Sequence, residues 1–99
     1  MKAFQITGKN EYGMKQVLHP TVKADEVIVK MRASGICHSD YLLVDGEYVL
    51  PFSYPVTPGH EWAGEIAEVG SQVNGFEVGD RVIGECAYGC GQCKMCLSG

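Results

Sequence analysis

The sequence has no long hydrophobic run and no cluster of like charges. Its apolar stretches are only a few residues long, and the N-terminal MKAFQITGKNEYG lacks the hydrophobic segment of a signal peptide. Eight Lys and Arg residues against twelve Asp and Glu residues give a net charge of −4, with neither sign gathered into one segment. This distribution offers no basic surface to nucleic acid or to an anionic bilayer. We therefore expect a cytoplasmic protein that binds a small molecule or another protein, with no nucleic acid and no membrane as partner.

The chain also lacks internal repeats, low-complexity tracts, an interdomain linker and a convincing long helix. Its 99 residues, 45% of them hydrophobic and 20% charged, suit one globular domain. A domain of this size is expected to bury roughly 65% of its unfolded surface. Alternating patterns predict strands over residues 1–6, 12–18, 25–34, 61–70 and 79–85. With 13 glycines for tight corners, the fold class predicted is mainly β, a small barrel.

The segment that joins the third and fourth predicted strands is interrupted by prolines. Tyr41 to Val44 are expected to form one or two helical turns. Beyond them, Pro51, Pro55 and Pro58 forbid regular structure, because proline lacks a backbone N–H and fixes φ. We therefore predict short helical turns followed by an irregular loop.

Cysteine is present in an odd number in a chain with no export signal, which favours metal ligands over a disulfide framework. Three of the five form a C-x2-C-x2-C array, Cys90, Cys93 and Cys96. Gly89 and Gly91 permit the tight turns that bring three thiolates onto one metal. The array strongly indicates a metal site but leaves the metal open, because a C-x2-C-x2-C-x3-C run also binds iron–sulfur clusters.

Reactive side chains also gather in GICHSD, residues 35–40, directly after a predicted strand. A lone Cys37 would more often be a small buried thiol, and we interpret Cys86 in that way. His60, in the GHE that ends the proline-rich loop, offers a second ligand just before another strand. A catalytic zinc takes three protein ligands, commonly from separated parts of the chain, and keeps a fourth position open. Cys37 and His60 are therefore candidate ligands.

The other polar residues of GICHSD have two interpretations each. Asp40 would either accept the second ring N–H of His60 or cap the helical turn that follows. Ser39 would either pass a proton from a metal-bound substrate or act as a cap. His38 carries a donor or a cation, although a lone surface histidine is more often inert. The residues alone do not choose between these interpretations.

Four segments, taken in this order and with this spacing, resemble the N-terminal domain of the zinc-dependent medium-chain alcohol dehydrogenases. They are GICHSD, PGHEWAGEIAEVG, VNGFEVGDRV and CGQCKMC. The resemblance covers essentially the whole chain. It implies a GroES-like, partly open β-barrel over residues 1–99 with a cysteine-rich zinc loop, truncated within the lobe that holds the structural zinc.

In that family a Rossmann domain for NAD or NADP follows, and no G-x-G-x-x-G fingerprint occurs in these 99 residues. The resemblance therefore implies the N-terminal part of a zinc-dependent, NAD(P)-linked dehydrogenase for an alcohol or polyol. We expect the complete enzyme to be a homo-oligomer. The 99 residues alone are predicted to have no dehydrogenase activity.

The resemblance also assigns the metals. It makes Cys37 and His60 ligands of a catalytic Zn²⁺. It places a structural Zn²⁺ on Cys90, Cys93 and Cys96. The third catalytic ligand and the fourth structural cysteine would come from beyond residue 99.

Four further side chains gain roles from the resemblance. Ser39 would relay the alcohol proton, and Asp40 would support His60 from behind. Glu61 would lie close behind the metal as a transient ligand, and His38 would approach the cofactor phosphates. Two other classes of protein remain open: a non-catalytic GroES-like binding module, and an iron–sulfur protein built on the cysteine array.

Overall fold

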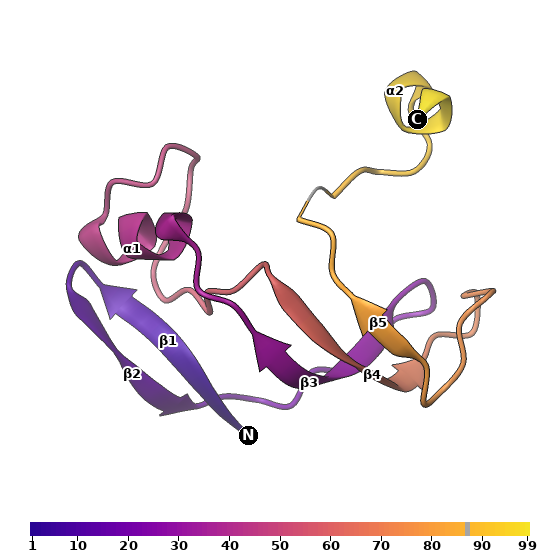
Figure 1. The fold of residues 1–99 in the computed structure, drawn as a ribbon, viewed down its shortest axis with the longest axis horizontal. Helices are drawn as coiled ribbons and strands as arrows, with labels where there is room; N and C mark the ends of the chain where they lie inside the picture. The colour runs from indigo at the N-terminus through magenta and orange to yellow at the C-terminus, as the bar shows by residue number, and fades with distance from the viewer. Residues whose placement is uncertain (87) are drawn as a thin grey trace.

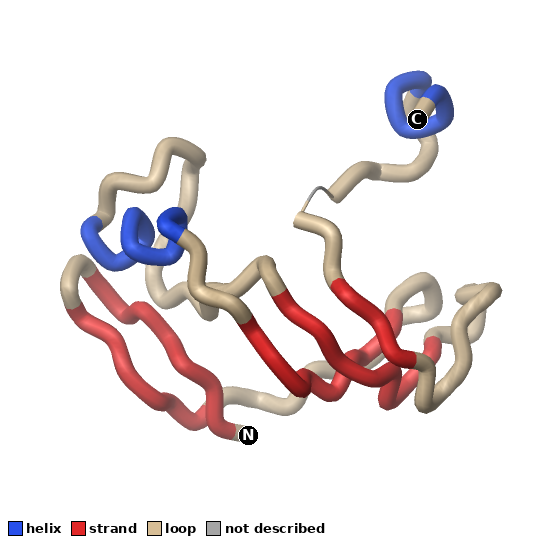
Figure 2. The backbone as a smooth tube through the Cα atoms, in the orientation of Figure 1, coloured by secondary structure: helices blue, strands red, loops and turns tan. Residues whose placement is uncertain are grey.

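The computed structural model describes residues 1–86 and 88–99, and the fold is mainly β, as predicted. Figure 1 shows its elements in chain order: β1 (Lys2–Gly8), β2 (Glu11–Gln16), β3 (Val27–Ser34), α1 (His38–Asp45), β4 (Trp62–Val69), β5 (Arg81–Ile83) and α2 (Lys94–Ser98). Strands β1 and β2 form an antiparallel hairpin, and a second antiparallel sheet has the order β3-β4-β5. Figure 2 shows the hairpin beside the sheet, with α1 next to the hairpin and α2 standing away from both.

The hairpin turns through Asn10, whose φ of 57° lies in the left-handed region that asparagine tolerates better than most residues. The Asn10 N–H donates to the Val44 carbonyl at 2.8 Å, so the turn is tied to α1. An isolated antiparallel bridge joins Ile6 of β1 to Val56 in the proline-rich loop. These contacts hold the hairpin, α1 and that loop together around Ile6, which is fully buried.

The β3–β4 pair forms the centre of the second sheet and depends on a glycine. A Cβ added at Gly64 would lie 2.5 Å from Val29 Cγ1 and 2.6 Å from the Lys30 carbonyl oxygen. Only glycine therefore allows β3 and β4 to approach as they do. Beside it, Arg32 donates to the Glu65 carboxylate across the same two strands at 2.8 Å.

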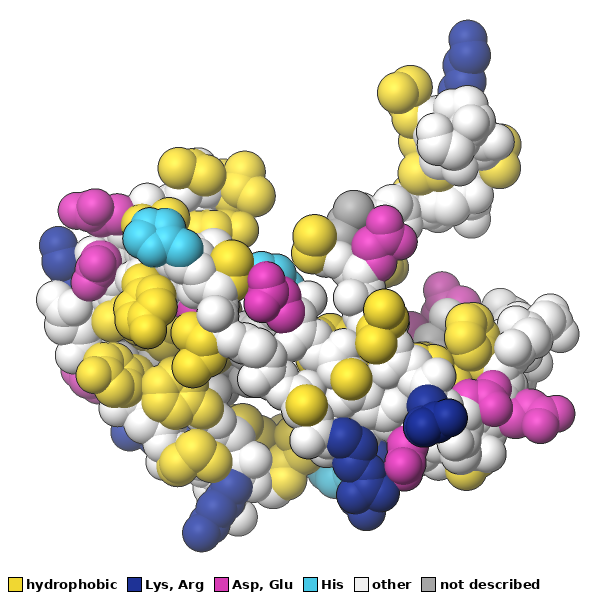
Figure 3. Space-filling view, in the orientation of Figure 1, with side chains coloured by type: hydrophobic (Ala, Val, Ile, Leu, Met, Phe, Trp, Pro, Cys, Tyr) yellow, Lys and Arg dark blue, Asp and Glu magenta, His cyan; other side chains and the backbone are white. Residues whose placement is uncertain are grey.

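The core is smaller than composition suggests. Among the described residues only Ile6 and Ile66 are buried hydrophobic side chains, and the exposed surface is 7828 Å². A compact monomer of 10.7 kDa would expose about 5,500 Å², and its unfolded chain about 15,500 Å². The chain thus buries about half of its surface, and the expected 65% was wrong. Figure 3 shows apolar side chains gathered on the surface over the hairpin and α1.

The helices depart from expectation more than the strands do. Helix α1 begins at His38 and not at Tyr41, so most of GICHSD lies at the helix start. The short helix α2, which contains Cys96, was not predicted. In the described part of the chain neither helix has the length and apolar character needed to cross a membrane.

Candidate metal centres

Two segments far apart in sequence meet at Gly35. This residue follows β3, and its N–H donates to the Glu61 carbonyl, just before β4, at 2.7 Å. A Cβ at Gly35 would lie 2.8 Å from Glu61 Oε2, so only glycine permits this close approach without a shift of the Glu61 side chain. The contact extends the β3–β4 pairing. It also brings the turn that carries Cys37 close to His60, which directly precedes Glu61.

The start of α1 fixes Cys37. Cys37 occupies the N-cap position with extended backbone angles, φ −98° and ψ 159°. Its N–H donates to Asp40 Oδ2 at 2.9 Å, and its carbonyl accepts from the Asp40 N–H at 3.0 Å. Asp40 therefore closes the helix start by reaching back to the cap, and Cys37 itself is the cap residue.

The second carboxylate oxygen of Asp40 has a different environment. Asp40 Oδ1 is buried and has no hydrogen-bond partner among the described residues. No hydrogen bond joins Asp40 to His60 in that part of the chain, so the predicted support of His60 remains a prediction. A buried oxygen without a donor nevertheless leaves one acceptor free in this region.

Cys37, His60 and Glu61 form the first group of donors, which we call the mixed-donor cluster. The Cys37 sulfur, a His60 ring nitrogen and a Glu61 carboxylate oxygen all lie within 4.8 Å of one another. Cys37 and His60 are half-buried, whereas Glu61 is exposed. A thiolate, an imidazole and a carboxylate are all zinc ligands, and three protein donors leave the fourth position open. The donor set therefore fits a catalytic zinc.

The environment of Cys37 favours its thiolate. Hydrogen bonds to the sulfur lower the pKa of Cys37, chiefly that from the Ser39 backbone N–H, then those from the Ser39 hydroxyl and the His60 ring. The negative charge of Glu61 acts in the opposite direction and raises this pKa. Cysteine binds a metal as the thiolate, so the backbone N–H of Ser39, which lowers this pKa most, assists metal binding at the sulfur.

A cleft of about 530 Å³ opens on the mixed-donor cluster. Its lining includes His60, Glu61, Trp62, Ile83 and Cys86. Cys86 is exposed, so its interpretation as a buried thiol was wrong. The cause is tertiary: the chain leaves β5 along the rim of the cleft and does not pass into a core. The sequence carries no signal that Cys86 and His60 line the same cleft, because β4 and β5 must first pair.

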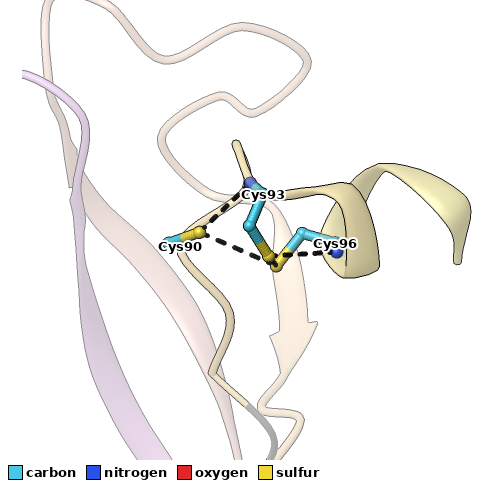
Figure 4. Close-up of side chains that lie close together, drawn as sticks. All are labelled: Cys90, Cys93 and Cys96. Carbon is cyan, nitrogen blue, oxygen red and sulfur yellow. Dashed lines mark hydrogen bonds between the residues drawn. The ribbon is translucent and has the colours of Figure 1, made fainter.

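The second group of donors is the thiolate loop, Cys90, Cys93 and Cys96, whose sulfurs point toward one another in Figure 4. The Cys93 sulfur is 3.5 Å from that of Cys96, and the Cys90 sulfur is 3.9 Å from it. Sulfurs at tetrahedral angles around zinc, each at about 2.3 Å, would be about 3.8 Å apart. All three side chains are exposed. The observed separations therefore fit a tetrahedral metal.

Backbone N–H groups surround the sulfurs of the thiolate loop. The pKa of Cys90 is lowered to about 7, first by the Gln92 N–H and then by the Cys93 N–H, which donates to the sulfur at 3.3 Å. The pKa of Cys93 is also lowered, chiefly by the Cys96 N–H. A Cβ at Gly89 would lie 2.8 Å from the Cys96 sulfur, so any other residue at this position would displace that sulfur.

The remaining candidates lie on α1. His38 is exposed at the first position of the helix, with its ring centroid 6.5 Å from that of Tyr41. Ser39 follows, half-buried and next to the Cys37 sulfur. The structure therefore brings Ser39 to the mixed-donor cluster and leaves His38 on the surface beside it. The roles assigned to both remain predictions.

The fold and the two clusters define the class of protein: a small β domain that carries two sets of metal-ligating side chains. Residues 23–99 match the family described as the alcohol dehydrogenase GroES-like domain. The match contains β3 to α2 and every donor of both clusters. The chain belongs to this family, and the resemblance stated from the sequence is confirmed.

Relatives in this family include enzymes for different substrates. The chain is 42% identical to a sorbitol dehydrogenase of Halalkalibacterium halodurans, over 100% of this chain and 29% of that protein. It is also 42% identical to an acryloyl-coenzyme A reductase of Metallosphaera sedula, over 100% of this chain and 30% of that protein. The chain thus spans less than a third of the length of these relatives.

Solved structures confirm the fold. A Sinorhizobium meliloti protein assigned as a zinc-binding dehydrogenase, in complex with NADP, superposes with a TM-score of 0.84 and 35% identity. The superposition covers 98% of this chain and 28% of the other. The arrangement of β1 to α2 is therefore that of the corresponding segment in a much longer protein.

Proposed function

We propose that this chain is the N-terminal, GroES-like part of the catalytic domain of a zinc-dependent, NAD(P)-linked alcohol or polyol dehydrogenase. The observation that carries the proposal is the mixed-donor cluster: residues 37, 60 and 61 come from two separate segments, yet their donor atoms lie within 4.8 Å of one another. A purely structural β domain does not need a thiolate, an imidazole and a carboxylate converging beside an open cleft. The sorbitol dehydrogenase relative supports the choice of substrate class.

Cys37, His60 and Glu61 would hold the catalytic zinc, and the thiolate loop would hold the structural one. When bound at the mixed-donor cluster, zinc supplies Lewis-acid chemistry that lowers the pKa of a substrate hydroxyl. The third donor in this proposal is Glu61, for which the family resemblance predicted only the role of a transient ligand. Its exposed carboxylate is already within reach of the other two donors.

The side chains around the cluster would orient the substrate and move its proton. The Ser39 hydroxyl lies next to the Cys37 sulfur, and from there it would accept the proton of the substrate hydroxyl and pass it on. Asp40 Oδ1, buried and without a hydrogen-bond donor among the residues that the structure describes, would accept the second ring N–H of His60 and fix the ring plane. His38, exposed on α1, would contact the phosphates of the dinucleotide.

The rest of the enzyme would supply what these 99 residues lack. We propose that a Rossmann domain for NAD or NADP follows and that the complete cytoplasmic enzyme is a homo-oligomer. The apolar surface over the hairpin and α1 supports this arrangement, because Phe4, Tyr12 and Tyr41 are 42%, 59% and 60% exposed. Patches of this kind mark surfaces that another part of a protein covers.

A chimera tests the proposal. Residues 1–99 replace the matching segment of the Halalkalibacterium halodurans sorbitol dehydrogenase, which supplies the remaining part of that enzyme. We expect NAD(P)-dependent oxidation of sorbitol or a short alcohol, whereas the 99 residues alone show neither activity nor saturable NADH binding. The matched control is the same chimera with His60→Ala. A chimera that folds and binds NAD(P)H but oxidises no alcohol or polyol contradicts the proposal.

A further inference from the structure

The thiolate loop contains a second pattern besides the metal site. Cys93 and Cys96 form a C-x-x-C pair at the start of α2, with Cys93 at the N-cap and Cys96 in the first turn. Their sulfurs are 3.5 Å apart, and the Cys96 N–H donates to the Cys93 sulfur at the same distance. A disulfide needs an S–S distance of about 2.05 Å, so a shift of about 1.5 Å would close the bond.

Exposure makes this pair accessible. Both side chains are exposed, and α2 stands away from both sheets in Figure 1. The helix has no buried residue. A small change at Cys93 and Cys96 therefore disturbs no packing among the described residues, unlike a change at Cys37, which is half-buried at the start of α1.

We propose that Cys93 and Cys96 are a redox-active pair that reacts with low-molecular-weight disulfides, and that the disulfide they form excludes the metal from the thiolate loop. One of the two thiolates attacks a sulfur of the small disulfide, forms a mixed disulfide and releases one small thiolate. The other cysteine then attacks the protein sulfur of the mixed disulfide, forms the Cys93–Cys96 bond and releases the second thiolate. The protein loses two protons and two electrons, and the small disulfide gains them as two thiols.

The consequence for metal binding follows from the shared sulfurs. A sulfur in a disulfide is no longer a thiolate, and only the thiolate is a metal ligand. Oxidation would leave Cys90 as the single thiolate of the loop, so the loop loses its metal. The mixed-donor cluster contains one cysteine, has no neighbouring sulfur in its donor group and should keep its metal.

The test uses the whole 99-residue chain, reduced and metal-free, treated with glutathione disulfide. Trypsin cuts after Lys94, which separates Cys93 from Cys96. A Cys93–Cys96 bond therefore links two tryptic peptides, residues 82–94 and 95–99, whereas a Cys90–Cys93 bond stays inside the first peptide. Mass spectrometry of the unreduced digest distinguishes the two, and fragment ions across Gly91 and Gln92 show which cysteine of the first peptide is linked.

Two variants serve as matched controls. Cys90→Ser should still give the linked peptides, and Cys93→Ser should not. The zinc-loaded chain should lose the zinc of the thiolate loop to a colorimetric chelator as glutathione disulfide is added, and dithiothreitol with fresh zinc should restore it. A bond from Cys90, stable mixed disulfides alone, or complete retention of zinc while the disulfide forms would each overturn the proposal.

Discussion

The two clusters hold metal-ligating side chains in different ways. The thiolate loop takes three sulfurs from seven consecutive residues, all exposed, with backbone N–H groups directed at the sulfurs. The mixed-donor cluster takes three different donor atoms from two segments that meet only because β3 pairs with β4 and Gly35 contacts Glu61. One is a product of local chain geometry, and the other is a product of the fold.

Under the proposed function, the two sets of donors would suit two different tasks. Three thiolates on a short loop can close around a metal and stabilise the loop, as structural zinc sites do. Mixed donors beside a cleft leave a coordination position for a substrate, as catalytic sites do. The role of a bound zinc would therefore depend on where the chain places its ligands. We expect a mutation in one cluster to leave metal binding at the other cluster unchanged.

The largest expected effect comes from removing a donor of the mixed-donor cluster in the active chimera. Cys37→Ser should lower kcat/KM by about 10³-fold or more, because the metal contributes several kcal/mol of charge stabilisation in the transition state. Zinc at the thiolate loop should be retained. Metal analysis and steady-state kinetics measure both.

The reciprocal variant is Cys93→Ser, which should remove the zinc of the thiolate loop and leave the catalytic zinc in place. In the isolated 99-residue chain the same change should abolish the zinc bound at the loop, since three local thiolates bind it without a fourth cysteine. Equal zinc content in the variant and the parent would contradict this assignment.

The Ser39 hydroxyl should matter for the reaction but not for metal content. Ser39→Ala in the chimera should lower kcat by roughly 10²-fold or more, within the range of general acid–base steps. The backbone N–H of Ser39, which contributes most to the lowered pKa of Cys37, stays in place. Full activity of Ser39→Ala across neutral pH would leave Ser39 with a structural role only. Ser53→Ala, at an exposed loop position, is the matched control.

Dependence on the fold is tested at Gly64. A Cβ there meets Val29 and the Lys30 carbonyl, so Gly64→Ala should destabilise the chain by about 1–3 kcal/mol. It should also weaken cobalt binding at the mixed-donor cluster, while the thiolate-to-cobalt absorption of the thiolate loop is unchanged. Gly13→Ala in β2 is the control, because nothing lies within 4 Å of the added Cβ. Equal loss at both clusters would show that they are not independent.

The smallest expected effect is the ionisation of one thiol, Cys90, in the metal-free thiolate loop. The pKa of Cys90 is lowered to about 7, so in the metal-free chain its thiolate should appear as the pH rises through about 7. Because the pKa of Cys90 is lower in the folded loop than in the unfolded chain, the thiolate stabilises the folded loop fully when the pH is above the ordinary thiol pKa. This stabilisation is lost as the pH falls through about 7. Ultraviolet thiolate absorbance measures the titration, and Cys90→Ser should remove it.

The positions of the strands along the chain were largely predictable from local sequence patterns. Alternation over 25–34 and 61–70 predicted β3 and β4, and the structure confirms both within a few residues. The helices were less predictable. Helix α1 has little amphipathic pattern and starts through the link between Cys37 and Asp40, and α2 is a single turn shaped around the thiolate loop.

The sequence by itself determined the thiolate loop, because thiols two residues apart, with glycine between them, converge through local geometry alone. It also identified Cys37 and His60 as separate candidates and, through four motifs, the family, whose resemblance added Glu61. Only the tertiary structure decided that these three donors meet and that Cys86 lies on the cleft that His60 also lines. The physical reason is range: local backbone geometry is encoded in neighbouring residues, whereas contacts across β3, β4 and β5 exist only after strands distant in sequence have paired.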